Sequence, residues 1–513
     1  MKKCLIAFLF TSLLYANSDE ELRNNPHIHR FSYSSYLLGP FFPQIPHISS
    51  YYPWGHHRFR IDDAQYFSDI AKQNPNGLLT LWFGNTPVIY VTNNETRISL
   101  VQESKIGVVN EAARSDLIDM FGHNNIMGTF LAFQPIDSEI HKQQRLFLLR
   151  RFSLNATELL PMVQESVNTF LQTHSQQTLP LRNFVTALVL HVSGQLLGIG
   201  EWDLAEKYLS DPDLRKTFES LARYGISQDA NPELEYRLYQ VFADTFQSNF
   251  DYIHKQTSSN SLLHIIFESR MIPFPESYSD FVNLDADLRH LIAMNFISIG
   301  LGGMVHSTAN SIDWALATLL KHPEKLSEFQ NLLRETDVDF TDGTVFEKSG
   351  PLFPIGQWVL YNVFLHPPFS HQFFFSQELY QAELPDGSIL EIPPKTLIIV
   401  NYRECNLTNS LAPSLEEFRE QLSETDTTWK FMRSPKMTAS FGGSAKGKTR
   451  VCPAAKVSLY EQMIVIATLL KSFSIRQESL SLEVNPEPFP IWSRRNEGTI
   501  TIHHRGRSLR EGN

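Results

Sequence analysis

The distribution of apolar residues predicts a mainly helical protein with small β-sheets. From about residue 99 to about residue 335 most of the chain has the apolar spacing of helices. One segment, "DLRHLIAMNFISIGLGGMVHSTANSIDWALATLLKHPEK", has no proline before Pro323 and would extend about 50 Å as one helix. Because it is apolar on most sides, we expect it to cross the centre of the protein.

Two shorter patterns predict strands. The stretch "GLLTLWFGNTPVIYVTN" has strand composition around Gly84-Asn85, which predicts a hairpin. The stretch "LYQAELPDGSILEIPPKTLIIVN" predicts short strands around a Pro-Asp-Gly turn. After about residue 472, short strand-like runs alternate with turns.

The amino-terminal residues "MKKCLIAFLFTSLLYANSDEE" have two lysines, an apolar run of about a dozen residues and then small residues near Ala16. This resembles a secretory signal peptide, because the apolar run is shorter than the about 20 residues that a membrane span needs. A short membrane anchor is the alternative. We therefore expect residues 1–17 to be a signal peptide or anchor, giving an exported (periplasmic or secreted) or membrane-anchored protein. Residues 18–56 are expected to form a strap rich in proline and aromatic residues, and 57–508 a single domain.

Charge and cysteine content narrow the function classes. The net charge of −11 provides no basic excess to neutralise phosphates, so no nucleic-acid partner is expected. The 3 cysteines, Cys4, Cys405 and Cys452, are far apart and form no C-x-x-C pattern.

The loop "FGGSAKGKTRVCPAAK" supports two competing interpretations. Gly442 to Thr449 matches the phosphate-binding pattern G-x-x-x-x-G-K-[ST]. However, the preceding "MRSPKMTAS" is too polar for a buried strand, and a helix starting near Gly447 would have Pro453 in its second turn. Only about 60 residues follow, too few for the βαβ units of such a fold. The sequence therefore argues against a nucleotide site.

The same proline favours a reactive or metal-binding cysteine. Proline suits the first position of a helix, so Pro453 is predicted to start the helix "AAKVSLYEQMIVIATLLKSF". Cys452 then lies at the amino terminus of that helix, where the helix dipole and nearby Arg450 favour a thiolate. The alternative is a buried cysteine that acts as a small hydrophobic residue.

The long apolar segment carries glycines near its middle, each of which costs about 1 kcal/mol relative to alanine in a helix. They are followed by His306, Ser307 and Thr308. Glycines allow a flat molecule to approach the backbone, and hydroxyls can hold a small polar molecule; close packing against another helix is the alternative. The glycines concerned are Gly300, Gly302 and Gly303.

Together these features resemble the cytochrome P-450 superfamily of haem-thiolate enzymes, from about Gly39 to the end of the chain. The family's cysteine loop reads F-x-x-G-x-R-x-C-x-G, and Phe441, Gly442, Arg450 and Cys452 resemble it in order and residue type but not in spacing. The resemblance implies a mainly α fold with small β-sheets, with haem b between the long central helix and the cysteine loop. It makes Cys452 the axial iron ligand and Arg450 a partner of a haem propionate.

Two further segments carry the resemblance. "EIHKQQRLFLLRRF" is similar to the family's W/H-x-x-x-R helix, which implies that His141 and Arg145 contact the propionates; their i, i+4 spacing also puts them on one helical face. The family's A-G-x-[DE]-T-T aligns with residues 303–308. His306 replaces the acid, so His306 and Ser307 are expected to handle protons, with Gly302–Thr308 as the distal wall.

The chain also departs from the family pattern. The E-x-x-R positions hold Tyr361 and Phe364, and the third member of that charge network is replaced by Leu422. Four residues are inserted before Cys452, and Ala454 replaces the last glycine of the loop. Since replacing a whole buried charge network with apolar residues can be neutral, we still expect folding and haem binding.

The resemblance implies a monooxygenase that inserts oxygen into a hydrophobic small molecule, with electrons from a ferredoxin, a flavodoxin or a reductase. Lys446 and Lys448 could dock an acidic donor. Because an exported protein would lack reduced nicotinamide cofactor, one alternative is a hydrogen-peroxide-driven peroxygenase or a hydroperoxide isomerase or dehydratase. A second alternative is a non-catalytic haem- or ligand-binding protein.

Overall fold

The computed structural model describes most of the chain from residue 61 to residue 505. The described residues are 28–29, 42, 44–48, 61–83, 86–101, 106–107, 138–200, 203–224, 232–376, 378–408, 416–418, 440–441, 451–483 and 494–505. The expected leader 1–17, most of the strap 18–56, and Leu422 lie outside them, as do Arg450, Lys446 and Lys448. Expectations about those residues stay predictions.

Within the region expected to form one domain, the chain gathers into two compact units. The smaller unit comprises 1–108, 371–409 and 444–448; the larger comprises 109–370, 410–443 and 449–513.

The smaller unit is built on a six-stranded sheet, in which the predicted hairpin is confirmed by antiparallel pairing of Leu81 with Val88. A second sheet pairs the two strands predicted around the Pro-Asp-Gly turn, where Gly387 adopts a φ of 80°. The first sheet has the order β2 (His47–Ile48), β3 (Leu78–Phe83), β4 (Thr86–Val91), β10 (Leu397–Asn401), β7 (His371–Ser376), β5 (Ile106–Gly107). The second has the order β1 (Ile28–His29), β9 (Ile389–Ile392), β8 (Tyr380–Glu383). The helices of this unit are α3 (Ile61–Ala71), α4 (Asn94–Leu100) and α20 (Tyr402–Thr408).

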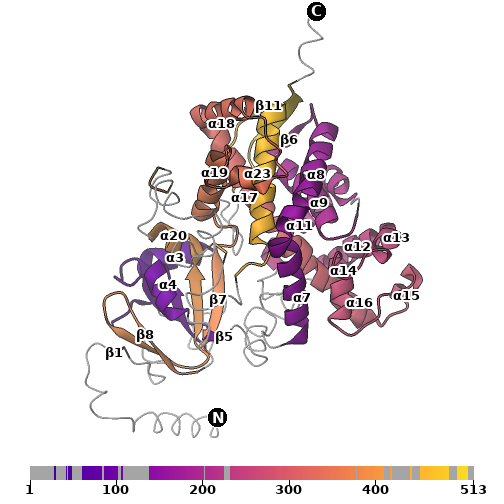
Figure 1. Cartoon of the computed structure of the whole chain (residues 1–513). Coiled ribbons are helices and arrows are strands. Elements are labelled where there is room, and N and C mark those ends of the chain that lie inside the picture. The colour runs from indigo at the N-terminus through magenta and orange to yellow at the C-terminus, as the bar shows by residue number, and fades with distance from the viewer. Residues whose placement is uncertain are drawn as a thin grey trace, which may run out of the picture. The chain divides into compact units, whose positions relative to one another are not determined.

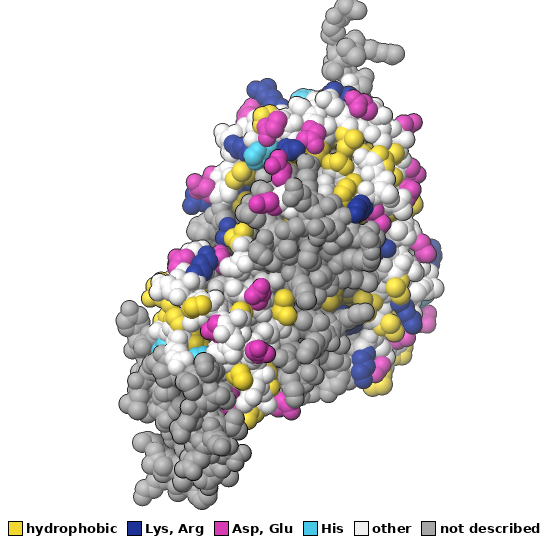
Figure 2. All heavy atoms as spheres, turned by 60° about the vertical axis from the view of Figure 1, so that its left-hand side comes forward, with side chains coloured by type: hydrophobic (Ala, Val, Ile, Leu, Met, Phe, Trp, Pro, Cys, Tyr) yellow, Lys and Arg dark blue, Asp and Glu magenta, His cyan; other side chains and the backbone are white. Residues whose placement is uncertain are grey.

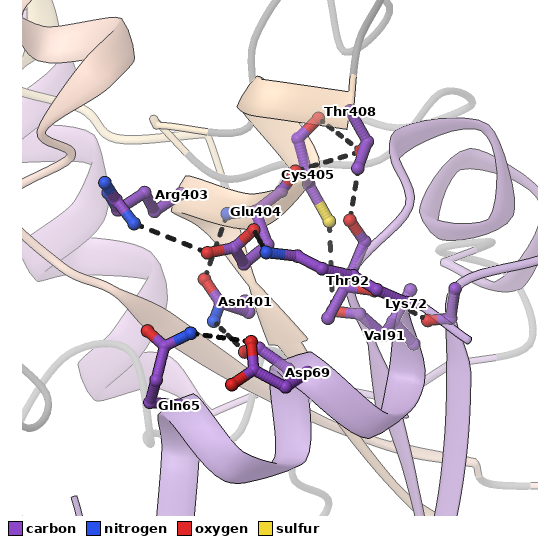
Figure 3. A network of polar contacts seen from close by, with 12 residues as sticks. Gln65, Asp69, Lys72, Val91, Thr92, Asn401, Arg403, Glu404, Cys405 and Thr408 are labelled. Atoms are coloured by element: carbon purple, nitrogen blue, oxygen red, sulfur yellow. Dashed lines mark hydrogen bonds and ion pairs between the residues drawn. The ribbon is translucent and has the colours of Figure 1, made fainter. Parts of the chain in front are cut away.

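A polar network around the buried Glu404 links α20 to Lys72, which directly follows α3 (Figure 3). The carboxylate of Glu404 accepts an ion pair from Lys72 at 2.6 Å and contacts Arg403 at 3.4 Å. Cys405 is fully buried beside the carbonyl oxygen of Val91, and burial raises the pKa of its thiol to about 12. Cys405 is therefore a protonated structural thiol at neutral pH.

The described part of the larger unit is helical apart from one small sheet (Figure 1). Its sheet has the order β11 (Phe473–Glu478), β12 (Thr499–His504), β6 (Thr178–Pro180). Its α-helices are α7 (Glu139–Leu149), α8 (Leu160–Thr173), α9 (Leu181–Leu196), α10 (Leu204–Ser210), α11 (Pro212–Tyr224), α12 (Pro232–Ser248), α13 (Phe250–His254), α14 (Leu262–Glu268), α15 (Tyr278–Val282), α16 (Ala286–Phe296), α17 (His306–Lys321), α18 (Pro323–Glu335), α19 (Phe353–Leu365) and α23 (Ala455–Ser472). Short helical turns are η4 (Arg150–Leu154), η5 (Ala156–Leu159) and η7 (Gly343–Phe346).

The predicted long central helix is confirmed. Helices α16 and α17 continue through a π-helical segment, η6 (Ile297–Val305), as one helix from Ala286 to Lys321. Asp285 caps its start, and Pro323 begins the next helix. Among the described residues it alone is long and apolar enough to cross a membrane, but 67% of the relevant window is buried inside the protein, as in a core helix.

Acidic and basic side chains are mixed among the described residues on the face shown in Figure 2. In the view of Figure 2 the lysines and arginines lie among aspartates and glutamates, and the described residues of this face carry no continuous basic patch.

Candidate functional site

Cys452 is held in a turn directly before helix α23. Its backbone N–H donates to the carbonyl of Phe441 at 2.9 Å, and backbone groups of Ala454 and Ala455 hydrogen-bond to its thiol. The helix begins at Ala455 rather than at Pro453 as predicted, because residues 453–454 form the turn around the sulfur.

The Cys452 side chain is exposed, yet it lies deep enough among protein atoms that burial raises the pKa of the thiol. The hydrogen bonds from Ala454 and Ala455 and the positive charge of Arg145 act in the opposite direction. The turn therefore offers an accessible sulfur with donors already aimed at its anionic form. This is the environment that a thiolate ligand requires.

The central helix has an accessible face at its glycines. From Ile292 to Ala317 every residue is buried except Gly302, Gly303 and Ser307, which are partly exposed. Among the described residues, a Cβ atom added at Gly302 would meet one atom within 4 Å, the carbonyl oxygen of Ile297 at 3.8 Å. The π-helical geometry of this stretch is common where a helix forms part of a functional site.

A hydrogen bond of 2.9 Å between the hydroxyls of Thr308 and Ser458 joins α17 to α23. Thr308 follows Ser307, and Ser458 comes six residues after Cys452, near the start of α23. The accessible thiol and the accessible glycine face therefore both lie close to this crossing. Small residues on one side and a thiol on the other fit a flat metal-bearing ring.

His306 does not share the accessible face. Its ring is buried 6.1 Å from Phe218 of α11 and hydrogen-bonds to the backbone of that residue. Burial, followed by the charge of Arg182, lowers its pKa to about 4. Of the two residues expected to handle protons, His306 is therefore neutral and buried. Ser307 lies on the accessible face, and its hydroxyl donates to the carbonyl of Gly303.

His141 and Arg145 share the face of α7 that their spacing predicts, and both are at least half-buried. Arg145 Nη2 donates to the carbonyl oxygen of Val451 at 3.0 Å, so the predicted propionate ligand lies beside the cysteine loop. The structure thus brings together Arg145, Phe441 and Cys452.

Sequence reasoning missed a buried acid, Glu461 on α23. Both of its carboxylate oxygens lack a hydrogen-bond partner among the described residues, and burial raises its pKa to about 8. The sequence signal for its burial is that Glu461 is the single acidic residue in the mostly apolar run "SLYEQMIVIATLL".

Aromatic side chains pack together at positions 361 and 364, which correspond to the E-x-x-R positions of the resemblance. Phe418 lies 5.4 Å from Tyr361 and 5.5 Å from Phe364, measured between ring centroids. These distances are typical of favourable aromatic pairs. The apolar replacement expected from the sequence is therefore realised as a packed cluster.

Within the described residues, no group of three or more histidines, cysteines, aspartates or glutamates could hold a metal ion. A single accessible thiol suits a metal that arrives with other ligands of its own, as in a porphyrin.

Comparison with solved structures decides the fold. The heme domain of a cytochrome P450DA mutant superposes with a TM-score of 0.62 at 14% identity, over 90% of this chain and 97% of that one. The chain has the cytochrome P-450 fold. The mainly helical fold with small sheets predicted from the sequence is thereby confirmed.

A sequence relative adds to this result. (+)-Menthofuran synthase of Mentha piperita is 26% identical over 214 residues, which is 41% of this chain and 40% of that protein. The match therefore covers less than half of the relative. No protein-family model matches the chain. The chain is therefore similar to cytochrome P-450 proteins in its fold and in part of its sequence, and the likeness to a heme domain indicates haem b as the cofactor.

Proposed function

We propose that this P-450 chain is a haem-thiolate monooxygenase of a hydrophobic small molecule, with Cys452 as the axial iron ligand. The observation that carries the proposal is the accessible Cys452 thiol, which accepts backbone hydrogen bonds from Ala454 and Ala455. These donors compensate for part of the burial that opposes the thiolate. Bound haem would supply oxygen activation at its iron.

The opposite wall would be the accessible face at Gly302, Gly303 and Ser307. Two glycines leave room beside the helix backbone, and the Ser307 oxygen keeps a lone pair for a small polar molecule while its proton is donated to Gly303. Thr308 hydrogen-bonds to Ser458 and holds the wall against the cysteine helix. His141, Arg145 and Arg450 are proposed to hold the propionates.

The balance of the reaction requires protons as well as electrons. One oxygen atom of O₂ would enter a C–H bond of the substrate, and the other would leave as water with two electrons from a redox partner and two protons. We retain His306 and Ser307 as the proposed proton-handling pair. Since the pKa of His306 is about 4, His306 would act as a neutral relay, not as a charged donor.

A peroxygenase, or a hydroperoxide isomerase or dehydratase, is the second candidate. It rests on the proposed export of the protein, which the signal-like residues 1–17 favour. A non-catalytic haem- or ligand-binding protein is the third candidate, and it rests on the Tyr361 and Phe364 replacements.

Turnover of haem-loaded protein with a panel of hydrophobic compounds separates these candidates. A monooxygenase oxidises a panel compound with O₂ and a reductase system, a peroxygenase does so with hydrogen peroxide alone, and an isomerase or dehydratase converts only an organic hydroperoxide. Compounds that shift the haem spectrum but are not converted in any arm would contradict the enzymatic proposals. That result would favour the binding protein.

A further inference from the structure

Two neighbouring residues of α7 reach the two elements that form the proposed site. Arg145 Nη2 donates to the carbonyl oxygen of Val451 at 3.0 Å. Gln144 Nε2 donates to Asn295 Oδ1 at 2.7 Å, and Gln144 and Asn295 are fully buried. Asn295 lies in α16, two residues before the π-helical segment begins. Helix α7 therefore holds the cysteine loop with one residue and the central helix with the next.

The carbonyl that Arg145 contacts belongs to the peptide group that links Val451 to Cys452. The N–H of the same peptide group donates to the carbonyl of Phe441 at 2.9 Å. Because a peptide group is planar, fixing its oxygen and its nitrogen fixes the orientation of the plane that leads into the Cys452 Cα atom. The direction of the Cys452 side chain then depends on these two hydrogen bonds.

We propose that Arg145 is a positioning residue for Cys452, which orients the thiol by fixing the Val451–Cys452 peptide group. This inference rests on the proposed function and adds to the expected propionate contact of Arg145. A guanidinium has five N–H donors, so the hydrogen bond to the carbonyl uses only one of them. The buried Gln144–Asn295 bond links α7 to the central helix.

The chemistry of the contact makes arginine specific for this role. A charged donor on a carbonyl forms a stronger hydrogen bond than a neutral one, and the planar fork of arginine is less flexible than a lysine side chain. Lysine at position 145 would keep the charge but hold the peptide group less well. Glutamine would lose both the charge and the reach.

Hydrogen exchange of the Cys452 amide in haem-free protein tests the proposal, because no propionate is then present. Arg145→Gln should speed exchange of this amide about tenfold, and Arg145→Lys by a smaller factor. Lys142→Gln removes the same charge from an exposed position of the same helix and should change nothing. Unchanged exchange in helix α9 would show that each variant is folded.

A second arm uses haem-loaded protein. The share of reduced, carbon-monoxide-bound protein with thiolate ligation should fall in Arg145→Gln and stay at the wild-type value in Lys142→Gln. If Arg145→Gln weakens haem binding while exchange of the Cys452 amide in haem-free protein equals that of the wild type, Arg145 only holds a propionate and the positioning role is wrong. If the wild type binds no haem, the proposed function fails, and the exchange experiment still decides the positioning role.

Discussion

The hydroxyl of Thr308 lies 2.9 Å from the hydroxyl of Ser458, and this hydrogen bond joins the central helix to the helix that follows the cysteine. Thr308 is buried, and Gln462 Nε2 donates to the same Ser458 oxygen at 3.3 Å. The pair thus connects the two walls of the proposed haem site through side chains alone.

The Thr308–Ser458 bond should show energetic coupling. Ser458→Ala removes the partner of the buried Thr308 hydroxyl, and Thr308→Val leaves the Ser458 hydroxyl with only the Gln462 bond, so each should lower the free energy of unfolding by about 1–3 kcal/mol. The double variant should lose less than the sum of the single variants, with a coupling energy of about 1 kcal/mol. Urea unfolding of the four proteins measures this, and strictly additive losses would show that the bond contributes nothing.

Glu461 should make the stability of the protein fall as pH rises. Its folded-state pKa of about 8 lies above the ordinary value of 4.5, so the folded state holds a proton that the unfolded state releases. The associated stability is fully present below about pH 4.5 and is lost as pH rises through 8, at a total cost on the order of 5 kcal/mol.

Glu461→Gln, which stays neutral, should remove this contribution to the pH dependence. Exposed Glu268 on α14 provides the control, since Glu268→Gln should leave the pH profile of the wild type unchanged. Unfolding free energies measured from pH 5 to pH 9 provide the comparison. Parallel profiles for the wild type and Glu461→Gln would contradict the assignment.

The buried ion pair of Asp313 and Arg494 should be costly to break from one side. The two side chains meet at 2.8 Å and are almost completely buried. Asp313→Ala should cost about 3–5 kcal/mol, because Arg494 is then left buried without its counter-charge. Replacing both residues, as in Asp313→Leu with Arg494→Met, should cost less than Asp313→Ala alone. A larger cost for the double replacement, measured by thermal or urea unfolding, would be the contrary result.

The accessible face of the central helix predicts opposite effects on stability and on cofactor binding. Gly302→Ala gains up to about 1 kcal/mol of helix propensity and has open space for its methyl group, so stability should rise. Haem affinity should fall if the ring lies against this face. At Gly300 an added Cβ would come within 3.2 Å of Leu197 Cδ1, so Gly300→Ala should stabilise less and leave haem affinity unchanged. Equal haem affinity of the wild type and Gly302→Ala would argue against this placement of the cofactor.

Patterns local in the sequence predicted much of the fold. The central helix follows from a long apolar stretch without proline, and the two hairpins follow from alternating strand residues around turn residues. The cysteine loop was found because glycine, arginine and proline flank Cys452 at positions with a physical meaning. Each of these signals lies within one segment of the chain.

The details of the candidate site depend on contacts between distant segments, which leave no such pattern. Gln144 and Asn295 are 151 positions apart, and Arg145 contacts a backbone carbonyl, which any residue at position 451 would provide. The orientation of His306 depends on the π-helical segment before it, which changes the phase of the helix relative to a regular 3.6-residue period. A buried acid such as Glu461, to which no described residue hydrogen-bonds, is recognisable only once the packing around it is known.

The absorption spectrum of the reduced, carbon-monoxide-bound protein tests the central claim most directly. Wild-type protein and Cys452→Ser are reconstituted with haem, alongside Cys405→Ser, which removes the buried structural thiol. The account predicts the spectrum of a thiolate-ligated haem in the wild type and in Cys405→Ser, and its loss in Cys452→Ser. A wild-type protein that binds no haem, or a Cys452→Ser spectrum equal to that of the wild type, would contradict it.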